Sequence, residues 1–396
     1  MEIIHGFDSE FIPSITTPRF VTDYAGDPND EVLVVETDES ARAYPIPILD
    51  LHHMVNDTVD GTPVLVAWCP LCGSGVVYER TIEKQELTFE FAGKLADNNF
   101  VMRDIETGTE WKQSTGEGLS GNLEGVTLPL QSARMTTWNS FQDAYPAGVV
   151  LAPPEEPTPY LFYRFEKTAT RLISNPAGRE FLDGVSKFVR AANLARDPQH
   201  GSSDVSIRPF FRLMQAGVEL SDWVLGRSER SVQYDGEPMA LYESGRVFGF
   251  PPVHGGTREW DNQGLDGLRA KTRVLGVSTD GAALGFPRPH VEAADGVVRA
   301  TVGETDVVVF ATDDELVAYD APGFSFEATD DPDRFVGDGA KWDVATGEST
   351  DGRTLSRLPA RWTFAFSWQS DHETARFYRE NKASASGLDP EGEADT

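Results

Sequence analysis

The amino-acid sequence predicts an α+β protein that is predominantly β, with two homologous β-rich domains related by internal duplication and a helical insert between them. Three observations support this prediction. Short strand-type runs separated by turn residues fill residues 31–91. A related pattern returns 242 positions later, and the segment between the two copies changes to a helical period.

The first strand-type runs are EVLVVET, TPVLVAW, GVVYERT and LTFEFAG, which are rich in β-branched and aromatic residues. Turn residues such as Asp60-Gly61 separate them. One short helix is expected at 47–55, because four residues there share a helical face: Ile48, Leu51, His52 and Val55. The unit is therefore mainly β, with one intervening helix.

An internal repeat is the strongest signal in the sequence. Residues 32–48 share eight identities with residues 274–290, and VLVVETD in the first copy becomes VLGVSTD in the second. With small gaps the match continues through four further pairs: Phe100-Val101 with Phe335-Val336, Trp111 with Trp342, Thr115-Gly116 with Thr346-Gly347, and Ala133-Arg134 with Ala360-Arg361. Two units with the same strand order are expected.

The sequence divides into six segments by composition and period. We expect an N-terminal arm at 1–30, a first β-rich repeat at 31–146, a connector and helical insert at 147–232, an inter-repeat segment at 233–271, a second, degenerate repeat at 272–380, and a disordered tail at 381–396. The stretch PAGVVLAPPEEPTP holds five prolines in fourteen residues, which predicts a stiff, extended connector. The tail lacks the apolar residues that could order it.

The insert has the period of amphipathic helices. Two helices are expected, near 178–196 and 207–226. The first places six apolar residues on one face: Phe181, Leu182, Val185, Phe188, Val189 and Ala192. Such a face is expected to pack against a β-domain or another helix, and it is also where a protein partner could dock.

The charge balance is strongly acidic. The chain has 64 Asp plus Glu against 34 Lys plus Arg, a formal charge of −30, and only eight of the basic residues are lysine. This composition is typical of proteins from a halophile's cytosol, where salt screens the repulsion, so a cytoplasmic location is expected. No cluster of Lys and Arg could neutralise phosphates, and no apolar run could cross a membrane, so nucleic acid and a membrane span are excluded.

The candidate chemistry lies in WCPLCGS, residues 68–74, a tight turn between two strand-type runs. The CPxCG pattern resembles a metal knuckle, in which backbone N–H groups point at thiolates. A complete site needs further ligands, and the first repeat offers His52, His53, Met54 and Met102. Cys69 and Cys72 with His52 suit zinc, whereas Met102 as an added soft ligand suits copper.

Two other interpretations of the cysteines stay open. The pair could act as a dithiol–disulfide couple, although thioredoxin-type sites place CxxC at a helix N-terminus. It could also be a turn without chemistry, in a structural or interaction module. The second copy reads FATDDELVAY where the first reads AWCPLCGSGVVY, so any chemistry belongs to the first repeat.

A second polar and aromatic cluster spans residues 98–116. Asp104, Glu110 and Gln113 are candidates to line a pocket, whereas Trp111 and its counterpart Trp342 are expected in the two cores. The sequence has no GxGxxG after a strand, no Walker loop, no GxSxG and no HExxH, so it gives no support to a nucleotide cofactor, an acyl-transfer site or a zincin site.

At these residues the sequence resembles the domain-of-unknown-function family numbered 3179, which is common in halophilic archaea and in bacteria. The matching stretches are ARAYPIPILDLHHMVNDTVDGTPVLVAWCPLCGSGVVYER and NNFVMRDIETGTEWKQ, with TRVLGV opening the second copy. The resemblance implies a histidine at His52, cysteines at Cys69 and Cys72, and the methionine and tryptophan of Met102 and Trp111. The helical insert departs from the family pattern, and the resemblance supplies no reaction.

From the residues and the resemblance together we expect a metal-binding protein, holding copper or zinc through Cys69, Cys72 and His52, or a redox protein that uses the same cysteines. The contrasting hypothesis is a structural or interaction module without enzymatic activity. The sequence does not decide whether the protein is an enzyme.

Overall fold

The computed structural model describes residues 3–379 with gaps at 7, 38–39, 156–157, 174, 197–203, 225–231, 235–246, 249–256, 259, 261–267, 280 and 373–375. The predicted disordered tail therefore lies outside the described residues, as does most of the inter-repeat segment. Of that segment the structure describes two short strands, β17 (Val247–Phe248) and β18 (Thr257–Arg258), which pair with each other.

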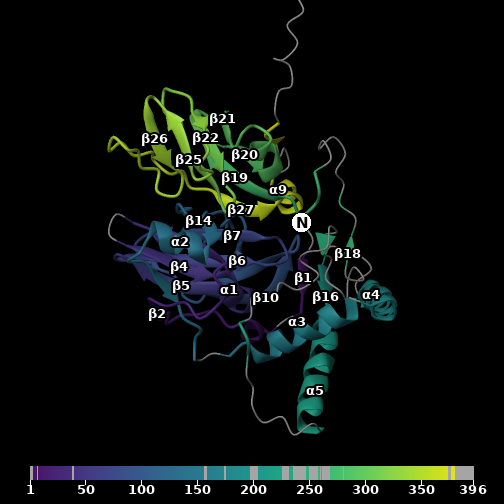
Figure 1. Cartoon of the computed structure of the whole chain (residues 1–396). Coiled ribbons are helices and arrows are strands. Elements are labelled where there is room, and N and C mark those ends of the chain that lie inside the picture. Colours follow the sequence, from purple (N-terminus) through teal and green to yellow (C-terminus); the bar gives the residue numbers. More distant parts are fainter. Residues whose placement is uncertain are drawn as a thin grey trace, which may run out of the picture.

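The first repeat alternates strands with two short helices (Figure 1). Its principal elements are β3 (Glu31–Glu36), β4 (Ala41–Pro45), α1 (Ile46–His52), β5 (Met54–Val59), β6 (Thr62–Cys69), β7 (Ser74–Glu79), β10 (Phe89–Ala96), β11 (Asn99–Asp104), β12 (Glu110–Lys112), β14 (Arg134–Thr137), α2 (Trp138–Ala144) and β15 (Val149–Leu151). Shorter strands β8 (Thr81–Ile82), β9 (Gln85–Glu86) and β13 (Gly118–Ser120) lie in its loops.

The second repeat follows the same order without the shorter strands. Its elements are β19 (Arg273–Thr279), β20 (Ala282–Pro287), α8 (Arg288–Glu292), β21 (Val297–Val302), β22 (Thr305–Ala311), β23 (Leu316–Asp320), β24 (Glu327–Ala328), β25 (Arg334–Gly337), β26 (Ala340–Asp343), β27 (Arg361–Phe364), α9 (Ala365–Asp371) and β28 (Arg376–Phe377).

Strand pairing confirms the duplication. The first repeat contains the strand order β14-β3-β4-β15, and the second contains β27-β19-β20-β28. The last pairing is parallel in both copies and the others are antiparallel. The register is also the same, since Val32 lies opposite Pro45 in one copy and Val274 opposite Pro287 in the other.

Trp111 and Trp342 occupy equivalent places, as the sequence predicts. The N–H of Gly116 donates to the carbonyl of Lys112, and the N–H of Gly347 donates to that of Asp343, one residue after each tryptophan.

One detail of the predicted alignment is wrong. Trp111 lies opposite Met102 and Trp342 lies opposite Phe335, so the counterpart of Phe335 is Met102 and not Phe100. The five-residue turn at 105–109 is reduced to two residues in the second copy, which shifts the register.

The insert is helical, and its described residues include a helix at Tyr160–Ile173 in addition to the two expected. Its helices are α3 (Tyr160–Ile173), α4 (Pro176–Arg196) and α5 (Arg208–Val224), which lie beside the first repeat (Figure 1). On α4, Leu182 and Val189 are buried, whereas Phe181 and Phe188 are 58 % and 73 % exposed. The predicted apolar face is therefore only partly covered.

The N-terminal arm and the connector belong to the first repeat more closely than the sequence indicates. β1 (Ile3–His5) pairs with β10 on one side and with β16 (Asp204–Ser206) of the insert on the other. A 3-10 turn at Ser9–Phe11 follows, and β2 (Phe20–Val21) pairs with β15. The proline-rich connector is thus not a free spacer at its start, because Val149–Leu151, between Pro146 and Pro153, forms β15.

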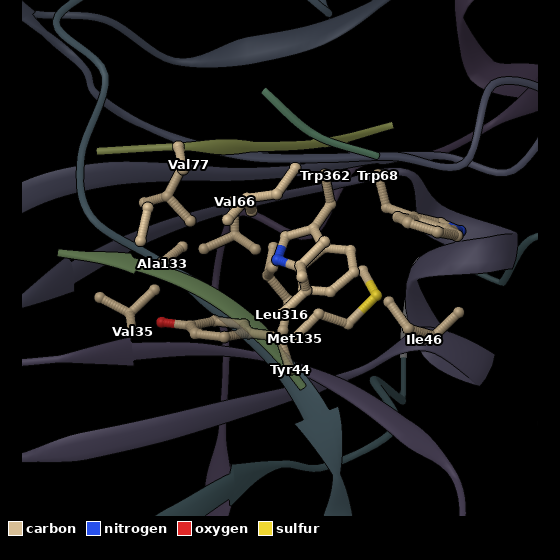
Figure 2. Close-up of a cluster of buried hydrophobic side chains, with 14 of the residues drawn as sticks. Val35, Tyr44, Ile46, Val66, Trp68, Val77, Ala133, Met135, Leu316 and Trp362 are labelled. Atoms are coloured by element: carbon tan, nitrogen blue, oxygen red, sulfur yellow. The ribbon is translucent and has the colours of Figure 1, made fainter. Parts of the chain in front are cut away.

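The two repeats share one hydrophobic core. Strand β27 of the second repeat pairs with β7 of the first at Trp362 and Gly75, which joins the strands into a seven-stranded sheet, β28-β20-β19-β27-β7-β6-β5. Figure 2 shows Leu316 and Trp362 of the second repeat among Val66 and Met135 of the first. Burial of these side chains on both sides of the boundary couples the stability of the two units.

No helix in the described part of the chain is both long and apolar enough to span a lipid bilayer.

Candidate functional site

The CPLCG turn joins β6 to β7 at the boundary between the repeats. Cys69 ends β6 opposite Ser74, and the N–H of Cys72 donates to the carbonyl of Cys69 at 3.2 Å. Gly73 has a φ of 56°, a left-handed conformation that glycine adopts without penalty. Both cysteines are free thiols and almost completely buried, at 1 % and 0 % exposed.

Hydrogen bonds concentrate on the sulfur of Cys69. Burial raises the pKa of this thiol, but the hydrogen bond from the Cys72 thiol opposes that effect. Backbone N–H groups of Phe100, Cys72 and Leu71 add to it, and together these donors hold the pKa below its usual value. When protonated, the Cys69 thiol faces the carbonyl oxygen of Asn98 at 3.9 Å. The turn therefore stabilises a thiolate at Cys69.

Cys72 lies against the second repeat. Its carbonyl oxygen accepts a hydrogen bond from the Phe364 N–H at 2.8 Å. Burial raises the pKa of the Cys72 thiol well above its usual value, and the neighbouring Cys69 sulfur and the Asp371 carboxylate raise it further, while the Ser367 hydroxyl acts in the opposite sense. The pKa values of the two thiols are thus shifted apart, that of Cys69 downward and that of Cys72 upward.

Two of the eight lysines of the chain lie at this boundary. The Lys112 ammonium is 2.8 Å from a carboxylate oxygen of Asp371 and 3.6 Å from one of Asp97. Burial lowers the pKa of Lys271 to about 8, and the nearby Cys72 acts in the opposite sense. A positive charge on either lysine would favour a thiolate in the turn.

Several buried polar atoms around the turn have no hydrogen-bond partner within the described residues. They are the Ser74 hydroxyl, the Asn98 amide nitrogen, the Asn99 and Gln113 amide oxygens, and the Ser114 hydroxyl. Other atoms of these groups are held in place, since the Gln113 amide nitrogen donates to the Ser74 carbonyl at 3.1 Å and that of Asn99 donates to the Ser367 hydroxyl at 3.2 Å. The boundary is therefore an unusually polar one for a buried interface.

His52 is engaged away from the cysteines. Its Nδ1 lies 2.8 Å from the Pro13 carbonyl oxygen, and its Nε2 lies 2.9 Å from the Tyr234 hydroxyl. Burial lowers the pKa of His52 to about 4, which keeps the ring neutral. With both ring nitrogens hydrogen-bonded, His52 fits a core histidine better than a metal ligand.

The remaining candidates have structural roles. Met102 is fully buried in the core that also contains both cysteines. Asp104 accepts hydrogen bonds from the Trp111 indole N–H at 2.9 Å and from Thr107, and Glu110 forms an ion pair with Lys94. Among the described residues, no three His, Cys, Asp or Glu side chains are grouped so that they could hold a metal ion.

Sequence reasoning missed the partners supplied by the second repeat. Ser367 and Asp371 lie on α9, almost 300 residues beyond the cysteines, and only the docking of the repeats brings them to the turn. The scarcity of lysine in this chain is the one sequence signal that draws attention to Lys112.

The fold and the site together define a tandem-repeat β-rich protein with a buried dithiol at the boundary between its repeats. The model of the family described as "Protein of unknown function (DUF3179)" matches residues 9–172 and 221–375, and the chain belongs to this family. Neither the curated proteins nor the solved structures contain a match to the chain.

Proposed function

We propose that the chain is a redox protein in which Cys69 and Cys72 form a reversible disulfide. The observation that carries this proposal is the asymmetry of the pair: the Cys72 thiol donates to a Cys69 sulfur whose pKa is lowered, while the pKa of Cys72 is raised. A thiolate beside a protonated partner is the arrangement that thiol–disulfide exchange uses.

The reaction balances with a small disulfide as the oxidant. The Cys69 thiolate attacks one sulfur of that disulfide, a sulfur–sulfur bond breaks, and one thiolate leaves. Cys72 then loses its proton, for which the Lys271 amine is a candidate acceptor, because it interacts electrostatically with Cys72 and burial lowers its pKa to about 8. The Cys72 thiolate attacks the Cys69 sulfur and releases the second thiolate. Two protein thiols have become one disulfide, and the substrate disulfide has become two thiols.

A metal-binding function of the same cysteines is the second candidate. The N–H groups directed at Cys69 stabilise a thiolate, which is the form that binds a soft metal. Zinc prefers four ligands and the described residues supply no group of three. Copper(I), a soft ion, therefore fits Cys69 and Cys72 better than zinc does.

The test uses the fact that the chain has only two cysteines, so a count of free thiols reports on this pair alone. Protein purified without chelator under argon is equilibrated with glutathione and glutathione disulfide in varied ratios, denatured, and labelled with a mass-tagged maleimide. We expect both thiols to disappear together in one two-electron transition. Cys69→Ser and Cys72→Ser should form no intramolecular disulfide.

Elemental analysis of the same samples separates the two candidates. Stoichiometric copper that is lost in both serine variants would replace the redox proposal with the metal-binding one. Thiols that stay reduced at every glutathione ratio, in protein without metal, would refute both and leave the turn as a structural feature.

An interaction module is a third candidate, and a separate observation favours it. Four large apolar side chains on α4 and α5 are exposed: Phe181, Phe188, Leu213 and Leu220. Exposed apolar side chains that recur along a helix are typical of association surfaces. Sedimentation of the chain and of Phe181→Ser/Phe188→Ser tests self-association through α4, and a monomer in both cases would count against it.

A further inference from the structure

A cleft of about 520 Å³ lies between β26, the β22–β23 turn and helix α2. Thr312 and Glu315 line it from the second repeat, and Ser140 and Asp143 line it from α2 of the first. Its volume is in the range of small-molecule sites. Nothing in the thiol chemistry proposed above uses it.

The cleft is the symmetry mate of the thiol site. In the thiol site, the turn between β6 and β7 of the first repeat faces α9 of the second repeat. In the cleft, the turn between β22 and β23 of the second repeat faces α2 of the first. Ser367 of α9 lies by Cys72, and Ser140, at the same position in α2, lines the cleft. The symmetry extends to two arginines, since Arg361 donates to the Ser114 carbonyl and Arg134 donates to the carbonyl of the equivalent residue, Ala345.

The two mates differ in what fills them. In the thiol site the Lys112 ammonium occupies the space between the turn and α9 and pairs with Asp371 at 2.8 Å. In the cleft, Asp343 stands in the place of Lys112, and Ala144 stands in the place of Asp371. The second site therefore lacks a counterpart of the Lys112–Asp371 ion pair, although Arg334 and Lys341 line it.

Carboxylates dominate the lining that remains. Six line the cleft: Asp143, Asp314, Glu315, Asp333, Asp343 and Glu348. Two basic residues accompany them, and one of these, Arg334, already lies 3.7 Å from Asp331 and 3.9 Å from Asp343. Burial raises the pKa of Asp333, as do the negative charges of Asp331, Asp314, Asp343 and Asp313. A cation in the cleft would relieve this repulsion.

Glu315 supplies a second and independent observation. It is 4 % exposed, and one carboxylate oxygen pairs with Arg134 at 2.6 Å, but the other oxygen has no hydrogen-bond partner within the described residues. A buried acceptor left without a donor costs free energy unless a ligand or water supplies the donor.

We propose that this cleft binds a small organic cation whose ammonium group takes the place that Lys112 fills in the other repeat. A bare metal ion does not fit, because no three carboxylates of the described residues are grouped for coordination. An ammonium group offers three donors to separated acceptors, which matches carboxylates and hydroxyls spread around a cleft. This site is independent of the redox proposal, since it contains neither cysteine.

The test is calorimetric titration of the full chain with 1,4-diaminobutane, in the salt in which the chain is folded, with 1,4-butanediol as the uncharged ligand of equal length. We expect one diamine bound per chain and no binding of the diol. Asp333→Asn should weaken diamine binding at least tenfold. Asp343→Lys, which restores the lysine of the first repeat, should abolish it.

A matched control distinguishes a site from general attraction to an acidic surface. Glu304→Gln removes one exposed carboxylate from the β21–β22 turn, outside the cleft, and should leave binding unchanged. Equal weakening by Glu304→Gln and Asp333→Asn would overturn the proposal, as would binding that survives in a folded Asp343→Lys variant. Thermal unfolding of each variant establishes that it is folded.

Discussion

The two cysteines are chemically unequal because their surroundings lower the pKa of Cys69 and raise that of Cys72. Cys72→Ala removes the thiol donor from the Cys69 sulfur, so we expect the pKa of Cys69 to rise and its alkylation by iodoacetamide at neutral pH to slow. The pH dependence of the alkylation rate measures this shift. Cys72→Ser is the matched control, since its hydroxyl can still donate. A Cys69 pKa that is the same in both variants would show that the backbone N–H groups alone stabilise the thiolate.

A half-buried carboxyl on α1 predicts a pH dependence of stability. Burial raises the pKa of Asp50 to about 7, while the hydrogen bond from the Trp68 indole N–H at 2.7 Å acts in the opposite sense. This pKa lies above the value of about 4 in the unfolded chain. The contribution of Asp50 to the free energy of unfolding is therefore fully present below pH 4 and is lost as the pH rises to about 7.

Asp50→Asn should therefore remove a decline in the free energy of unfolding between about pH 4 and pH 7. His52 and His53 act in the other direction, since burial lowers their pKa values to about 4 and about 3 and stability is lost as the pH falls below about 6.5. The difference between wild type and variant isolates Asp50. Urea unfolding at several pH values gives the measurement, and parallel pH profiles for the two proteins would contradict it.

At the scale of single elements, the CPLCG turn is held in shape by its glycine and by the second repeat. A Cβ at Gly73 would lie 2.8 Å from the ring of Phe364, in addition to the strain of a positive φ. Gly73→Ala should therefore destabilise the chain by more than the ~1–2 kcal/mol of left-handed strain alone. Gly108→Ala is the control, because Gly108 has a φ of +72° with nothing within 4 Å.

Urea unfolding of both alanine variants separates strain from packing. Equal losses of stability in the two would mean that the turn does not press against Phe364, and the description of the turn as part of the repeat boundary would then fail.

Local sequence signals predict the elements well where local forces decide them. The strand runs and the two principal insert helices follow from their periods, but the helix expected at 47–55 ends at His52. His53 has a φ of 60°, and its carbonyl accepts a hydrogen bond from the Trp68 N–H, so the chain enters β5 at Met54. Val55, expected on the helix, pairs with Val66 in a sheet. A pairing between strands thus overrides the helical period there.

At the scale of the whole molecule, the sequence predicts the duplication but not how the two copies pack against each other. Identities between the copies predict two similar folds, but they do not predict that the short helix of each copy faces a turn of the other. That docking decides the site, because it brings Ser367 and Asp371 of α9 to the cysteines. The polar partners of a buried site that spans two domains cannot be found from local patterns.

Two equivalent arginines tie the repeats together in different ways. Arg134, 1 % exposed, pairs with the Glu315 carboxylate at 2.6 Å and donates to the Ala345 carbonyl at 3.1 Å. Arg361 donates at 2.8 Å to the Ser114 carbonyl and at 3.0 Å to a serine hydroxyl of its own repeat. Only the first arginine compensates a buried negative charge.

Removing each arginine should therefore have unequal effects. Arg134→Met removes the ion pair of the buried Glu315 carboxylate, which keeps only the Thr136 hydroxyl and the more distant charge of Arg357, and this costs up to about 3–5 kcal/mol. Arg361→Met leaves only neutral acceptors unpaired, which costs about 1–3 kcal/mol. Because the repeats share one core, each variant should unfold in urea as a single transition at a lower midpoint, with Arg134→Met the lower of the two. A second transition in Arg134→Met would mean that the repeats fold independently, and equal midpoints would mean that Glu315 takes up a proton at little cost when its partner is removed.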